Sequence, residues 1–160
     1  MRGVQPLLLI DVDGVLNPWG VDECPAGFVE YALFPEDDEP VRLAAVHGEW
    51  LAELTAAFDL VWASAWGFQA HELLGPILGL DEFPFVPMPP IPFPPDEKVP
   101  AIAAYVGDRA TAWIDDSLGD VARQWAAGRA APTLLVHVDH AVGLARQHVD
   151  DLVTWARNLR

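Results

Sequence analysis

The sequence predicts an α/β fold in which a mostly parallel, five-stranded sheet is covered by helices on both faces, a three-layer sandwich. Strand-like apolar runs alternate along the chain with segments whose apolar residues recur at helical spacing, which is typical of parallel sheets with helices packed on them. The length of 160 residues suits one domain with its own core, and no shift in composition marks a second. We therefore expect residues 1–160 to form a single domain.

Five strands are expected, and four of them are clear apolar runs. These four span residues 7–11, 59–64, 111–115 and 133–138. The fifth, residues 83–86, lies in a proline-rich stretch, and proline confines a strand to the edge of a sheet. We therefore expect 83–86 to be a short edge strand.

The first helix is expected between the first two clear strands. It begins near Gly48 and continues almost to the next strand. Its side chains at three-and-four spacing would face the core: Leu51, Leu54, Thr55 and Phe58. This segment therefore has the pattern of a helix with one buried face.

Four further helices are expected, over residues 71–78, 100–106 and 120–127 and at the C-terminal end. Pro100 suits a first helical turn, where its missing N–H is harmless, and Asp120 is a candidate cap. The terminal helix has a buried stripe: Val149, Leu152, Val153 and Ala156.

Two segments interrupt the alternation. Residues 17–46 contain a turn at 18–20, a hairpin around 28–33 and an acidic cluster at 36–39, and we expect them to form a flap, a minimal cap, over the strand ends. Residues 83–95 are rich in proline, which predicts extended chain on the surface that acts as a connector.

Composition excludes several classes of function. The formal net charge of −15 would repel phosphate backbones, so nucleic acid is a disfavoured partner. The apolar runs are too short to cross a bilayer or to act as a secretory signal, so we expect no membrane contact and a cytoplasmic location. Cys24 is the only cysteine, which excludes an internal disulfide and a cysteine-based metal site.

The first strand leads directly into Asp11-Val12-Asp13-Gly14. Gly14 permits a sharp turn where the apolar run ends, which places both acids at the carboxyl end of a strand. Ligands bind at that end in parallel α/β sheets. Taken alone, this motif fits an ordinary acidic turn equally well.

Further polar residues stand at the same predicted edge of the sheet. In chain order the features are Asp11 with Asp13, Ser64 at a strand end, Lys98 at a helix start, and Asp115 with Asp116 at another strand end. Together they resemble the motifs of the haloacid dehalogenase (HAD) superfamily of phosphohydrolases. The resemblance covers residues 7–138 and implies a Rossmann-like fold.

Three carboxylates of this set would crowd negative charge into a small volume. At an effective dielectric constant of about 20, each pair 4 Å apart costs roughly 4 kcal/mol. A divalent cation removes that conflict, and Mg²⁺ prefers oxygen ligands of this kind. The resemblance implies that Asp11 and one of Asp115 and Asp116 bind Mg²⁺ through their side chains, and Asp13 through its backbone carbonyl.

The resemblance also implies a Mg²⁺-dependent phosphomonoester hydrolase that acts through an aspartyl-phosphate. Asp11 would be the nucleophile and Asp13 the general acid and base. Ser64 would donate its hydroxyl to a phosphoryl oxygen, and Lys98 would neutralise charge on the same group. The substrate would be a phosphorylated molecule, and the small flap implies an open site.

Four of these residues also have a purely structural interpretation. Ser64 fits a strand-end hydroxyl, Asp116 a helix cap, Asp13 an Asx-turn and Lys98 a solvated helix start. Trp19 and Trp66 flank the motifs, where they would line a substrate pocket, but seven tryptophans in a chain of this size are mostly core residues.

Two other functions fit the same motifs. The chain would be a non-catalytic HAD-fold binding protein if its acidic cluster at 36–39 engaged a basic partner. It would be a phosphotransferase if an acceptor other than water took the phosphoryl group.

Overall fold

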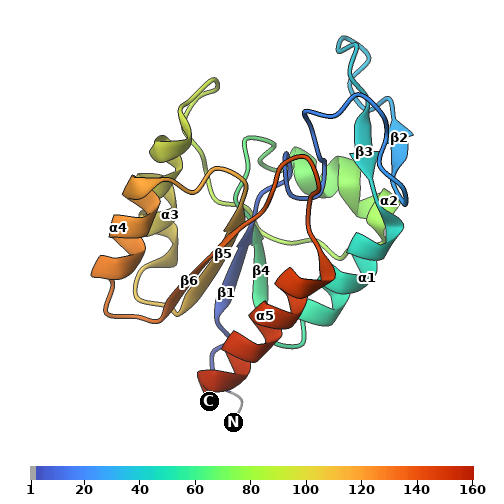
Figure 1. The fold of residues 1–160 in the computed structure, drawn as a ribbon. Helices are drawn as coiled ribbons and strands as arrows, with labels where there is room; N and C mark the ends of the chain where they lie inside the picture. The colour runs from blue at the N-terminus through green and yellow to red at the C-terminus, as the bar shows by residue number, and fades with distance from the viewer. Residues whose placement is uncertain (1–2) are drawn as a thin grey trace.

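Four parallel strands form the central sheet of the computed structural model, which describes residues 3–160 (Figure 1). Their order is β4 (Asp59–Trp62), β1 (Leu7–Ile10), β5 (Thr111–Asp115) and β6 (Thr133–His137). All pair in parallel, so their carboxyl ends lie at one edge of the sheet. The predicted α/β fold with a mostly parallel sheet is confirmed.

The strand order creates a switch point at β1. The chain leaves β1 for β4 on one side and then crosses over to β5 on the other. Ile10, the last residue of β1, lies opposite Trp62 of β4 and Ile114 of β5. Ligand crevices of open α/β sheets form at the carboxyl ends beside such a point.

Helices cover both faces of the sheet (Figure 1). Those on one face are α1 (Ala45–Leu54), α2 (Gly75–Leu78) and α5 (Arg146–Asn158), and those on the other are α3 (Lys98–Val106) and α4 (Asp120–Gly128). Two short helical segments precede α2 and α3: the π-helix η1 (Ala70–Leu74) and the 3₁₀-helix η2 (Pro95–Glu97).

Side-chain alternation along β1 divides the apolar residues into two cores. Leu8 and Ile10 pack on the face covered by α1 and α5, while Leu7 and Leu9 pack on the face covered by α3 and α4. All four side chains are at most 3% exposed. Burying one such side chain stabilises the fold by about 1.5–3 kcal/mol, so β1 is a rigid base for the residues that follow it.

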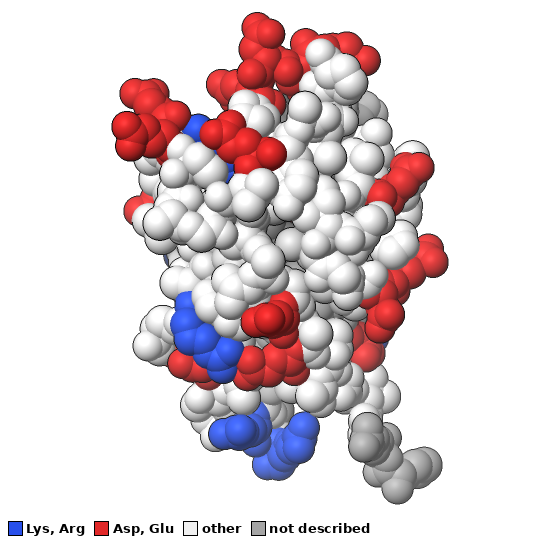
Figure 2. Space-filling model, turned by 90° about the vertical axis from the view of Figure 1, so that its right-hand side faces the viewer, with Lys and Arg blue, Asp and Glu red and all other residues white. Residues whose placement is uncertain are grey.

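The segment between β1 and α1 carries a second, two-stranded sheet. Here β2 (Val29–Tyr31) pairs antiparallel with β3 (Val41–Leu43). The predicted hairpin around 28–33 is wrong in extent, because the partner strand follows only after the acidic residues 36–39. Those four residues are exposed, and Figure 2 shows acidic side chains gathered at the upper end of one face.

Three local predictions need correction. The expected edge strand at 83–86 is reduced to one bridge, between Trp62 and Phe85, because proline lacks the N–H that a ladder needs. Thr55 is exposed and lies just after α1, which ends at Leu54. Asp120 is the first residue of α4 rather than its cap, which is Gly119.

No helix within residues 3–160 is both long and apolar enough to cross a membrane.

Candidate active site

The turn after β1 positions the first two acids. Asp11 follows the last strand residue and is 6% exposed, and its Oδ1 accepts a hydrogen bond of 2.8 Å from the Val12 amide. The amides of Val15, Leu16 and Asn17 all point to the Val12 carbonyl, which closes a tight turn. Asp13 lies in this turn, directly after Val12, and it is exposed.

Lys98 joins two of the predicted acids. Its Nζ lies 3.3 Å from Asp11 Oδ1 and 2.8 Å from Asp115 Oδ2, and it also donates to the Ala63 carbonyl at 3.1 Å. The lysine side chain is 10% exposed, so these contacts are made away from bulk water. Lys98 is therefore a buried ion-pair partner, and its interpretation as a solvated helix-start residue is wrong.

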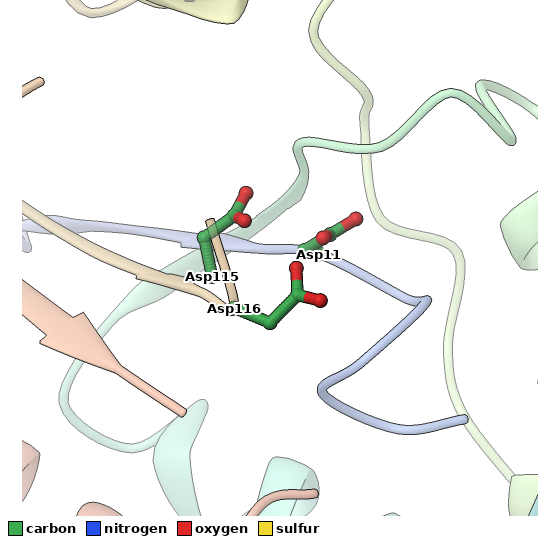
Figure 3. Close-up of side chains that lie close together, drawn as sticks. All are labelled: Asp11, Asp115 and Asp116. Carbon is green, nitrogen blue, oxygen red and sulfur yellow. The ribbon is translucent and has the colours of Figure 1, made fainter. Parts of the chain in front are cut away.

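Asp11, Asp115 and Asp116 direct their carboxylates toward one small space (Figure 3). One oxygen from each lies within 4.8 Å of the others. Asp115 ends β5 and is 1% exposed, and its Oδ1 accepts from the Ser117 amide at 2.9 Å. Asp116 lies four residues before α4 and is not a helix cap.

Ser64 is the remaining member of the predicted set. It lies two residues beyond β4 and is 2% exposed. Its Oγ accepts a hydrogen bond of 3.2 Å from the Trp66 amide, so the local turn described by the structural interpretation is present. The same contact leaves the hydroxyl proton available to another acceptor.

Two indole groups donate hydrogen bonds to Asp13 and Asp116. Trp66 Nε1 donates to Asp13 Oδ2 at 3.1 Å, and Asn17 Nδ2 donates to Asp13 Oδ1 at 2.9 Å. Trp19 Nε1 donates to Asp116 Oδ2 at 3.1 Å, and the Trp19 ring stacks on His140 with centroids 3.8 Å apart. Both tryptophans thus contact the site rather than serve only as core.

Burial and like charges perturb the acids. Burial raises the pKa of Asp11 well above its usual range, and Asp115 and Asp116 add to this, although Lys98 opposes it. Burial also raises the pKa of Asp116, against the hydrogen bond from Trp19. For Lys98, burial alone would lower the pKa, but Asp11 and Asp115 together raise it.

All six predicted site residues line one pocket of about 360 Å³. Its other wall is apolar and comes from the proline-rich segment: Ile91, Pro92, Phe93 and Pro95. A larger hollow of about 830 Å³ lies at the amino ends of the strands and contains none of the predicted acids. The smaller pocket is the candidate active site because the charged groups converge there.

The residues present fit a magnesium ion. Three carboxylates with oxygens within 4.8 Å of one another are hard ligands, and Lys98 supplies only one positive charge against them. Burial raises the pKa of Asp11, so without a cation this carboxylate binds a proton more readily than a free aspartate does. Asp11, Asp115 and Asp116 are therefore the residues that would hold the ion.

A comparison with known protein families shows which family this chain belongs to. A family model described as the HAD domain in Swiss Army Knife RNA repair proteins matches residues 7–149. The chain belongs to this HAD family. No curated protein matches the chain. Membership supports a hydrolase or phosphotransferase type of function, and the acidic cluster is consistent with it.

Several residues of this HAD site were not anticipated. The apolar wall at 91–95 was expected to be a surface connector, and nothing in its composition relates it to the acids. Asn17 and the two indoles were also not assigned as hydrogen-bond donors. Their positions within a few residues of Asp13 and Ser64 were the only available signal.

Gly14→Ala is expected to destabilise the HAD domain and displace Asp116. Gly14 has φ +83°, and an added Cβ would overlap the Asp116 carboxylate. The conformational cost alone is about 1–2 kcal/mol. Urea unfolding measures the loss, and Gly27→Ala is the matched control because Gly27 has φ +88° with open space around it. Equal losses in both variants would show that contact with Asp116 does not matter.

Magnesium affinity is expected to weaken as the pH falls through the raised pKa of Asp11. The folded protein without metal retains the Asp11 proton at pH values where the unfolded chain has lost it, so its stability falls as pH rises through the raised pKa. Magnesium must displace that proton. Calorimetric titration at several pH values measures the coupling, and a pH-independent affinity would contradict it.

Proposed function

We propose that this HAD domain is a Mg²⁺-dependent phosphomonoester hydrolase that works through an aspartyl-phosphate on Asp11. The observation that supports this most strongly is the buried contact of Lys98 with both Asp11 and Asp115, beside the three-carboxylate cluster. A bound magnesium ion would offset the negative charge of the carboxylates and of the phosphoryl group. Asp11, Asp115 and Asp116 would bind it, and the backbone carbonyl of Asp13 completes the proposed ligand set.

Asp11 is the proposed nucleophile. One of its carboxylate oxygens attacks phosphorus, the ester P–O bond breaks, and the leaving alkoxide takes a proton from Asp13. Water then attacks the same phosphorus with Asp13 as base, which releases inorganic phosphate and restores Asp11. Val12 and Lys98 both contact Asp11 Oδ1, so the carboxylate enters the reaction with its orientation fixed.

Asp13 is held by two hydrogen-bond donors. Each of its oxygens accepts one N–H hydrogen bond, from Asn17 and from Trp66. A carboxyl oxygen has two lone-pair sites, so one site on each oxygen stays free for a proton. Asp13 therefore accepts and releases a proton without losing either donor, and its exposed position leaves that proton open to the leaving group and to water.

Lys98 and Ser64 act on the phosphoryl group in this proposal. Lys98 lies between two carboxylates and supplies the only side-chain cation among the residues that line the pocket. The Ser64 hydroxyl donates to a phosphoryl oxygen while its own oxygen still accepts from Trp66. Fixed donors of this type favour the transition state because they need no rearrangement as charge develops.

The family description brings RNA into the set of candidate substrates. Internal phosphates of RNA are diesters, so a phosphomonoesterase acts only on a terminal phosphate. The net charge of −15 and the exposed acidic cluster at 36–39 oppose contact along a polynucleotide backbone. We therefore propose a phosphomonoester held at its terminal group, with no extended nucleic-acid interface, no membrane and the cytoplasm as the site of action.

Phosphate release from a panel of monoesters, with and without Mg²⁺, tests this function. The panel contains sugar phosphates, nucleoside monophosphates, phosphopeptides and oligonucleotides with a 5′- or 3′-terminal phosphate. We expect release that requires Mg²⁺. Added alcohols reveal phosphoryl transfer to another acceptor. No release from any member, with stoichiometric recovery of a bound protein partner, would instead support a non-catalytic binding protein.

A further inference from the structure

The apolar wall of the pocket has no role in either hydrophobic core. Within the described chain, neither hydrophobic core contains Ile91 or Phe93. By contrast, Phe83 packs against the core on the side of α1 and α5, and Met88 packs against the core on the side of α3 and α4. Ile91 is 70% exposed, and Phe93 is partly exposed. Exposed apolar groups that face a polar site are typical of ligand contacts. Stability of the fold therefore does not explain why these apolar side chains lie beside the acids.

The pocket is larger than its charged part requires. Its volume of about 360 Å³ lies in the range of roughly 300–1,000 Å³ that small-molecule sites occupy. The acids and Lys98 account for a phosphoryl group and a cation. The space beside 91–95 is left for the part of the substrate that carries the phosphate.

The charged residues that line the pocket restrict the chemical nature of the leaving group, the part of the substrate that carries the phosphate. Lys98 is the only cation among the lining residues, and Asp11 and Asp115 already contact it. A second phosphate would find no positive partner there and four carboxylates nearby: Asp11, Asp13, Asp115 and Asp116. A further anionic group is therefore disfavoured in the leaving group, and the contacts left for it are the uncharged ones of the apolar wall.

We propose that the wall formed by Ile91, Pro92 and Phe93 binds a nucleobase of the substrate, so that the site selects phosphomonoesters whose leaving group carries a base. This inference rests on the proposed phosphatase function and names its substrate class. A base offers a flat face to an aromatic ring and an apolar wall without adding charge. The base belongs either to a free mononucleotide or to the terminal nucleotide of an RNA, which share this chemistry.

Matched substrate pairs test the proposal. The first pair is adenosine 5′-monophosphate and ribose 5-phosphate, in which a hydroxyl on C1 replaces the base. The second is a short RNA with a terminal phosphate, at either end, and the same RNA with an abasic terminal residue. We expect kcat/KM to be about 10-fold to 100-fold higher for the base-bearing member of at least one pair. The pair that shows the preference identifies the source of the base.

Substitutions assign the preference to the wall. Phe93→Ala should lower the ratio of kcat/KM values within the preferred pair, whereas Phe93→Tyr should retain most of it. Phe68→Ala is the matched control, because Phe68 is 62% exposed and does not line the pocket. Exposure of Phe93 outside both cores favours normal folding of its variants, which melting temperatures check.

The outcomes separate the two proposals. Equal kcat/KM values within both pairs, with Mg²⁺-dependent release from all members, would overturn the base site and leave the phosphatase standing. A preference that survives in Phe93→Ala would also overturn the assignment to the wall. No release from any phosphomonoester would overturn the phosphatase, and the base site with it.

Discussion

Replacing Asp11 with Asn is expected to abolish phosphomonoester hydrolysis, with a loss in kcat of about a thousand-fold or more. An amide cannot form the covalent phosphoryl intermediate, and it is a weaker ligand for Mg²⁺. The fold should survive, because Lys98 keeps its 2.8 Å contact with Asp115. Phosphate release under saturating substrate and Mg²⁺ measures the effect.

A matched control separates chemistry from charge. Asp59→Asn makes the same substitution at the amino end of β4, where Asp59 pairs with Arg109 at 2.7 Å. This variant should keep its activity, since it lies at the opposite edge of the sheet from the acids. Comparable hydrolysis by Asp11→Asn and the wild type would refute Asp11 as nucleophile.

Lys98→Met is expected to lower the free energy of unfolding of the metal-free protein by about 3–5 kcal/mol at neutral pH. The substitution leaves Asp11 and Asp115 buried without their shared cation, and the two side chains are only 8% and 1% exposed. Urea unfolding in the presence of a chelator measures the loss. Catalysis should fail as well, because the phosphoryl group loses its side-chain cation.

Two conditions should restore part of this stability: lower pH, because it protonates Asp11, and Mg²⁺, because it replaces the missing positive charge. In addition, the double variant Lys98→Met with Asp11→Asn should lose less unfolding free energy than the sum of the losses in the two single variants. Asp59→Asn is the control, because it removes only the partly exposed pair with Arg109, which is worth about 0–1 kcal/mol. An unchanged unfolding free energy in Lys98→Met would contradict the buried ion-pair account.

The convergence of Asp11, Lys98 and Asp115 followed from the sequence because apolar runs determine where strands end. Parallel strands place those ends at one edge, whatever the loops between them do. The register of β1 with β5 then brings two acids together that lie far apart in the chain. Lys98 reaches them because its helix starts at the same edge.

The loop contacts could not be predicted in the same way. Trp66 and Trp19 donate to acids 53 and 97 positions away, and no periodicity encodes where an indole N–H points. The position of Phe93 in the pocket depends on the path of a proline-rich segment with few backbone hydrogen bonds. The single bridge at Phe85 shows the same difficulty, since proline disrupted an otherwise strand-like run.

Trapping of the covalent intermediate is the most direct test of the central claim. Borohydride added during turnover reduces an aspartyl-phosphate to homoserine, and peptide mass spectrometry identifies the residue that was changed. We predict conversion at Asp11 that requires both substrate and Mg²⁺. Continued phosphate release with Asp11 unmodified, or conversion at Asp13, Asp115 or Asp116 instead, would contradict the account.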